Sequence, residues 1–147
     1  MSTCTFFGHH DCPVTVERTL YMALVDLVEE HRVDTFYVGR QGAFDAIALS
    51  ALKNLIHQYP HIQYSVVLER IPGKCNCIGN YEGINTMLPE GIETVHPRYA
   101  ILWRNNWMLD RSDFIVAYIK HSWGGAAKFV EKAAQQGKVI INLGYCS

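Results

Sequence analysis

Short apolar runs rich in β-branched and aromatic residues alternate along the chain with longer segments of helical periodicity. The strand-like runs cover residues 5–7, 35–38, 64–68, 114–119 and 139–143, each bounded by Gly, Pro, Asp or Asn. Between the first two runs, Leu20, Leu24, Leu27 and Val28 recur at steps of three and four residues, which predicts an amphipathic helix. Between the second and third, a denser apolar stretch ends at Tyr59-Pro60 and predicts a helix packed against a sheet.

This alternation of strands and helices predicts an α/β fold. We expect a Rossmann-like three-layer sandwich with a mainly parallel sheet of about five strands. The length of 147 residues, of which 49% are hydrophobic, suits one domain over residues 1–147. Proline and glycine residues interrupt the pattern at about 71–95 and predict a long loop insertion there. Such a loop is either a lid or specificity element, or an ordered surface excursion without ligand contact.

Charge and hydropathy narrow the choice of partners. The net charge is −1, from 13 Lys and Arg and 14 Asp and Glu, and no basic stripe follows one surface, so we expect no nucleic-acid partner. No segment approaches the roughly 20 apolar residues needed to cross a bilayer, and the N-terminus lacks the pattern of a secretory signal. We therefore expect a cytoplasmic protein without a membrane partner.

The five cysteines are an odd number, which favours reduced thiols over a disulfide framework. Cys75 and Cys77 are separated by one residue rather than by the two of a zinc or redox motif. Cys12, His9 and His10 could in principle complete a metal site with them. We expect no metal and no cofactor, with a cysteine-based metal or redox protein as an alternative.

The turn after the first strand carries candidate ligand-binding residues, because ligands bind at the carboxyl ends of parallel strands. Gly8 lets the backbone turn sharply beside a ligand, and His9 can donate to a phosphate or accept a proton near neutral pH. The alternative is a turn whose histidines only cap the next helix.

The turn after the second strand has glycines and one arginine. Gly39 and Gly42 permit close approach of the backbone, and Arg40 can make paired hydrogen bonds to a phosphate. Asp45 lies in the first turn of the following helix, where it either binds a ribose or complements the helix dipole. The spacing departs from the Gly-x-Gly-x-x-Gly fingerprint, which disfavours a conventional NAD dehydrogenase.

The run at 114–119 leads into a glycine pair and then a helix. Gly124 and Gly125 leave the backbone N–H groups of the helix start free to bind a phosphate, and Trp123 before them is placed to stack on a base or ribose. The helix that precedes this strand offers Arg104 and Asn105 on the face opposite its apolar residues. These residues predict a phosphorylated, nucleotide-like ligand.

Together these loops resemble the SLOG superfamily, the Rossmann-like group that contains the DprA/SMF and LOG proteins, and in particular its small single-domain bacterial or phage members. LOG proteins carry Arg-x-x-x-Met before Pro-Gly-Gly-x-Gly-Thr-x-x-Glu, which Arg104, Met108, Gly124, Gly125 and Glu131 match here. The LOG branch cleaves the N-glycosidic bond of nucleoside monophosphates. The resemblance covers nearly the whole chain.

The chain differs from the LOG motif at two places: Trp123 replaces the proline, and Ala127-Lys128 replaces the Gly-Thr. Our leading interpretation is therefore a protein that binds a nucleotide or nucleotide-derived ligand, for example as a sensor. The alternative is a LOG-like nucleoside 5′-monophosphate phosphoribohydrolase, in which the resemblance implies catalytic roles for Glu131 and Arg104.

The resemblance also implies a homo-oligomer, since SLOG proteins commonly dimerise. The aromatic residues Trp103 and Trp107 lie on one predicted helix and offer an apolar interface for it.

Overall fold

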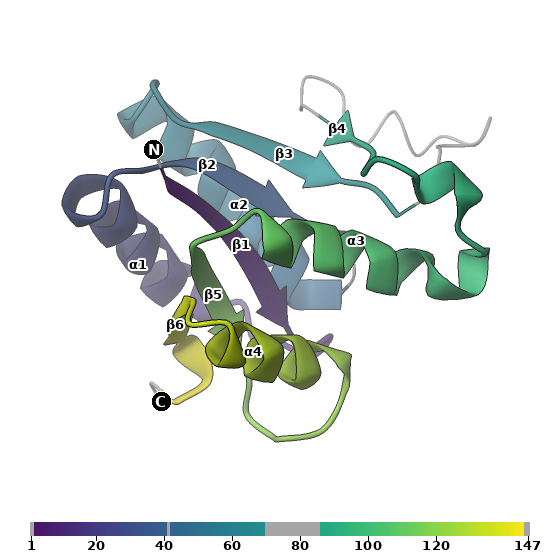
Figure 1. The fold of residues 1–147 in the computed structure, drawn as a ribbon. Helices are drawn as coiled ribbons and strands as arrows, with labels where there is room; N and C mark the ends of the chain where they lie inside the picture. The colour runs from purple at the N-terminus through teal and green to yellow at the C-terminus, as the bar shows by residue number, and fades with distance from the viewer. Residues whose placement is uncertain (1, 41, 70–85, 146–147) are drawn as a thin grey trace.

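A parallel β-sheet with helices on both faces forms the framework of the molecule (Figure 1). The computed structural model describes residues 2–40, 42–69 and 86–145. Along the chain the strands and α-helices are β1 (Ser2–Gly8), α1 (Val16–Glu30), β2 (Val33–Val38), α2 (Gly42–Gln58), β3 (Gln63–Val67), β4 (Thr86–Met87), α3 (Ala100–Asp110), β5 (Phe114–Tyr118), α4 (Gly125–Gln135) and β6 (Val139–Asn142). Short 3₁₀ turns lie at Ile92–Thr94, Pro97–Tyr99 and Leu143–Tyr145.

The described sheet has the order β4-β3-β2-β1-β5-β6, and every neighbouring pair is parallel. The chain winds outward from β1 in one direction through β2 and β3, and in the other direction through β5 and β6. The reversal between β1 and β5 is a topological switch point, where α/β proteins bind their ligands. Gly8 is in register with Tyr118, so these two strands end level with one another at the carboxyl edge.

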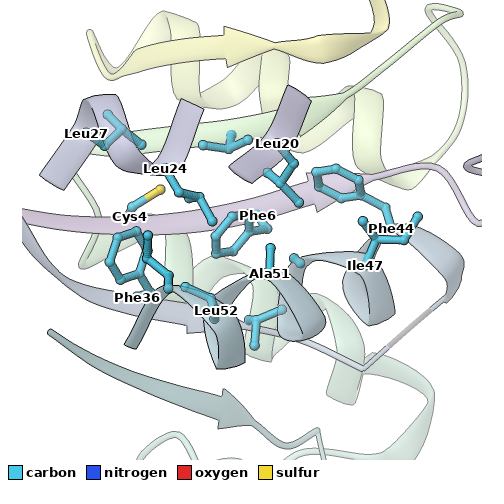
Figure 2. Close-up of a cluster of buried hydrophobic side chains, with 14 of the residues drawn as sticks. Cys4, Phe6, Leu20, Leu24, Leu27, Phe36, Phe44, Ile47, Ala51 and Leu52 are labelled. Carbon is cyan, nitrogen blue, oxygen red and sulfur yellow. The ribbon is translucent and has the colours of Figure 1, made fainter. Parts of the chain in front are cut away.

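Each face of the sheet has its own apolar core, because successive side chains of a strand point to opposite faces. Phe6 belongs to the core under α1 and α2, which Figure 2 shows with the side chains of both helices converging on β1 and β2. Phe7 belongs to the core under α3 and α4, where its ring stacks on Phe129 at 5.3 Å between centroids. The helical periodicity at Leu20, Leu24 and Leu27 is thus the buried stripe of α1.

The Rossmann-like α/β fold predicted from the sequence is confirmed, with one correction to the strand count. A sixth strand, β4, lies inside the segment that we expected to be a loop at about 71–95. It has only two residues and pairs with Val66 and Val67 of β3. So short a run has no alternation of its own to reveal it, because its pairing depends on the backbone of β3. Residues 70–85, with Cys75 and Cys77, lie outside the described part of the chain.

The two tryptophans of α3 differ in their exposure. The side chain of Trp103 is 43% exposed, and those of Ile101 and Leu102 beside it in the chain are exposed as well. Trp107 instead packs edge-on against Tyr37 at 5.1 Å between ring centroids. Homo-oligomerisation remains a prediction. Within the described ranges, no helix is long and apolar enough to cross a membrane.

Candidate functional site

A cavity of about 520 Å³ lies at the switch point, beyond the carboxyl ends of β1 and β5. Its wall is built by those two strand ends and the loops after them, Asp45 from α2, one face of α3 and the start of α4. The volume falls in the range of roughly 300–1,000 Å³ that is usual for small-molecule sites. The lining residues are Phe6, Phe7, Gly8, His9, His10, Asp11, Asp45, Ile101, Arg104, Asn105, Met108, Tyr118, Lys120, His121, Trp123, Gly124, Gly125 and Ala126.

Most of the residues predicted from the sequence come together in this wall, although they come from the end of β1, the loops after β1 and β5, and three helices. Those that line the cavity are Gly8, His9, Asp45, Arg104, Asn105, Trp123, Gly124 and Gly125. Those that do not are Gly39, Arg40, Gly42 and Glu131. The turn after β2 therefore contributes less to the cavity than its glycines suggested.

The two glycines of that turn are needed for internal packing. A Cβ on Gly39 would lie 3.0 Å from Cζ of Arg104 and 3.1 Å from Oδ2 of Asp45. Gly42 has a φ of +87°, which L side chains rarely adopt, and its Cβ would lie 2.7 Å from Nδ1 of His10. The glycines thus let the turn pack against Arg104 and against the loop after β1.

Behind this turn lies a cluster of paired charges. The Arg40 guanidinium donates from Nε and Nη2 to the carboxylate of Glu69, with Nη2 2.9 Å from Oε1. Arg104, which is only 2% exposed, reaches the same carboxylate with Nη1 3.4 Å from Oε2. Its Nε and Nη2 both donate to Oδ1 of Asn105, at 3.2 and 2.9 Å. Paired hydrogen bonds of this kind hold a guanidinium in one orientation.

The charges in this cluster balance one another. Burial opposes ionisation of Glu69, but hydrogen bonds from Arg40 and the charges of both arginines outweigh it and hold the pKa of Glu69 below its ordinary value. Burial lowers the pKa of Arg104, while the carboxylates of Asp45 and Glu69 act in the opposite direction. Both arginines are therefore already neutralised by buried carboxylates.

The loop after β5 is built differently. Gly124 has φ +100° and ψ 165°, a conformation essentially restricted to glycine, and it caps α4 without any side-chain hydrogen bond. A Cβ on Gly125 would meet nothing within 4 Å, although this residue lines the cavity. The start of α4 therefore faces open space with its first backbone N–H groups uncapped by a side chain.

Three aromatic rings form a stack along this side of the cavity. The His9 and His121 rings lie 3.7 Å apart, and the His121 and Trp123 rings 3.6 Å apart, both pairs nearly parallel. The backbone N–H of Lys120 donates to Nε2 of His9 at 3.1 Å, so His9 must be unprotonated at that nitrogen. Burial lowers the pKa of His9, and the neighbouring His121 lowers it further. Trp123, at the end of the stack, is 69% exposed.

Among the wall residues that were not predicted as site residues from the sequence, two lie at the carboxyl end of β5. Lys120 and His121 both line the cavity directly after β5. Their position just after a strand could have predicted them, because the same rule, that ligands bind at the carboxyl ends of parallel strands, pointed to Gly124 and Gly125. By contrast, Glu131 is exposed on α4, outside the cavity wall.

The described cysteines are unlike metal or redox groups. Burial raises the pKa of the Cys12 thiol to about 11, although the charge of Lys120 acts to lower it. Cys4 is fully buried in the core, and burial raises its pKa as well. Within residues 2–40, 42–69 and 86–145, no three His, Cys, Asp or Glu side chains are grouped so as to hold a metal ion.

A scan against protein-family models and a search of curated protein sequences gave no match. Among solved structures, the fold is similar to that of DNA processing protein A (DprA) from Streptococcus pneumoniae, with a TM-score of 0.68. The similarity covers 97% of this chain and 50% of DprA, so this chain corresponds to about half of that protein. At 14% sequence identity the likeness shows a shared Rossmann-like fold.

Proposed function

We propose that this protein binds a nucleotide or nucleotide-derived ligand in the cavity at the carboxyl edge of the sheet, and that it acts as a sensor of that ligand. The observation that carries the proposal is the start of α4. It follows Gly124 without a side-chain cap and lines a cavity of about 520 Å³ at the topological switch point. Backbone N–H groups and the helix dipole at such a position favour a phosphate.

The rest of the wall suits the other parts of a nucleotide. Phe6, Phe7 and Met108 give it an apolar portion, and Trp123 has an exposed ring on which a base can stack. Membership of the SLOG superfamily is part of the proposal. The DprA-like fold supports it, and so does the succession of Arg104, Met108 and the glycine pair along the chain.

Binding is favoured over cleavage by the position of Glu131. The LOG-like alternative needs this carboxylate beside the glycosidic bond, whereas here it is exposed on α4 and does not line the cavity. The structural similarity to DprA, a DNA processing protein, makes a nucleic-acid ligand the other candidate. The net charge of −1 and the dimensions of the cavity favour a single nucleotide instead.

Calorimetry and thermal denaturation with a panel of nucleoside monophosphates, cyclic nucleotides and ADP-ribose test the proposal. Saturation by a true ligand at about 100 times Kd adds about 2.7 kcal/mol to the free energy of unfolding. Gly125→Leu fills the open space at the start of α4 and should abolish binding. Ala134→Leu adds bulk to an exposed position of the same helix outside the cavity and should leave binding intact. A folded protein that no member of the panel stabilises would refute the proposal.

The same mixtures distinguish binding from the alternatives. Chromatography for free base should show none. Release of base that Glu131→Gln abolishes would establish the hydrolase instead. Fluorescence anisotropy with a single-stranded oligonucleotide should show no saturable binding at physiological salt, and tight binding there would point to a nucleic-acid partner.

A further inference from the structure

We infer that Lys120 is the side chain that binds the anionic group of the ligand, whereas Arg40 and Arg104, the arginines expected from the sequence, do not. This inference rests on the proposed function for the identity of the site, and it names the residue that recognises the charge. The chemical class that it specifies is a phosphate or a similarly compact oxyanion.

Lys120 is placed in the wall by the end of β5. It follows Tyr118 by two residues, is exposed, and lines the cavity. Its ammonium lies 5.7 Å from the centroid of the Tyr118 ring, a cation–π distance. No described carboxylate makes an ion pair with it, and Asp11, the exposed carboxylate of the same wall, is no exception. The positive charge of Lys120 is therefore available to an anion.

The arginines are in the opposite situation. Arg104 is almost fully buried and divides its donors between Glu69 and Asn105, while Arg40 binds Glu69 and does not line the cavity. Turning either guanidinium toward a ligand would leave the buried Glu69 carboxylate with fewer partners, which is strongly unfavourable. Lys120 can bind an anion without breaking any ion pair of the described protein.

The main chain at Lys120 is fixed by the loop after β1. Its N–H donates to Nε2 of His9, whose ring is stacked on His121. The ammonium group is thus attached to a backbone that both flanking strands hold in place.

Lys128 provides a matched control. It lies in the first turn of α4, where the helix dipole favours an anion. In the structure Lys128 is exposed but does not line the cavity. Each lysine can be replaced by methionine, which keeps the length of the side chain and removes the charge.

Titration with inorganic phosphate, followed by two-dimensional amide NMR at constant ionic strength, tests the role of Lys120 without a nucleotide. The wild type should show saturable shifts at residues 120–126. Lys120→Met should weaken binding about tenfold or more, as expected for the loss of a charge-assisted hydrogen bond. Lys128→Met should stay within about twofold of the wild type, and Lys120→Arg should retain most of the affinity. Absence of saturable shifts in the wild type, or equal binding by Lys120→Met, would overturn the inference.

A parallel comparison of AMP with adenosine separates this inference from the proposed function. If phosphate binds through Lys120 but no nucleotide binds, the proposed function fails and the role of Lys120 stands. If nucleotides bind and Lys120→Met binds them as tightly as the wild type does, the proposed function stands and the role of Lys120 fails.

Discussion

Two turns at the same edge of the sheet look alike in sequence and differ in structure. The turn after β2 and the loop after β5 both combine glycines and a basic residue with the start of a helix. In the turn after β2, the glycines pack against Arg104 and His10, and Arg40 is paired with Glu69. In the loop after β5, Gly125 faces open space and Lys120 has no ion pair with a described carboxylate.

The difference shows what the position of a strand end can and cannot reveal. Parallel strands bring both turns to the carboxyl edge, so position alone marks both as candidate sites. Whether a turn is free to bind a ligand depends on whether its charges and its backbone already have partners within the protein. By that criterion the turn after β2 is a structural support, and the loop after β5 is the side that we propose to bind the ligand.

The largest expected effect on stability is at Arg104, which pairs with Glu69 behind the turn after β2 and also lines the cavity. Arg104→Met removes one partner from buried Glu69 and Asp45, and it should lower the free energy of unfolding by about 3–5 kcal/mol. Urea denaturation measures this change. Arg98→Met, at an exposed arginine, should change stability by less than about 0.5 kcal/mol. A loss at Arg104 no larger than that of the control would mean that the charge cluster does not support the turn.

The glycines of the two turns should respond differently to the same substitution. Gly42→Ala introduces a Cβ at a φ of +87° and 2.8 Å from Cα of His10, and it should cost about 1–3 kcal/mol. Gly125→Ala meets nothing within 4 Å and should be neutral, or stabilising by up to about 1 kcal/mol. Equal losses in the two variants, measured by thermal or urea unfolding, would remove the contrast between the turns.

The smallest expected effect is a pH dependence that originates in Glu69. Because its pKa is lower in the folded protein than its ordinary value of 4.5, its ionised form stabilises the fold at higher pH. This contribution is lost as the pH falls below 4.5 and through the lowered pKa. The free energy of unfolding of Glu69→Gln should therefore decline less steeply with falling pH than that of the wild type. Parallel slopes for the two proteins would show that Glu69 is not stabilised in its ionised form.

Much of the fold followed from the sequence because it depends on local pattern. Alternating apolar runs and helical stripes such as Leu20, Leu24 and Leu27 specify each element and the face that it buries. The strand β4 did not follow, since its two residues are held by pairing with β3 rather than by a pattern of their own.

The candidate site was predictable only in part, for a related reason. The strand-end rule placed Gly8, His9 and the glycine pair in the cavity wall. The ion pairs of Arg40 and Arg104 with Glu69 could not be predicted from the sequence. Glu69 comes from the segment after β3, 29 residues from Arg40 and 35 residues from Arg104. The sequence therefore offered several basic residues without showing which of them has no ion pair with a described carboxylate.

The central claim is that a nucleotide binds on the side of the cavity formed by the loop after β5. The most direct test is to map the amide shifts caused by the nucleotide that stabilises the protein most. The account predicts the largest shifts at residues 8–11 and 118–126, with small changes at 39–42. Saturable shifts centred on 39–42, or none with any nucleotide, would contradict it.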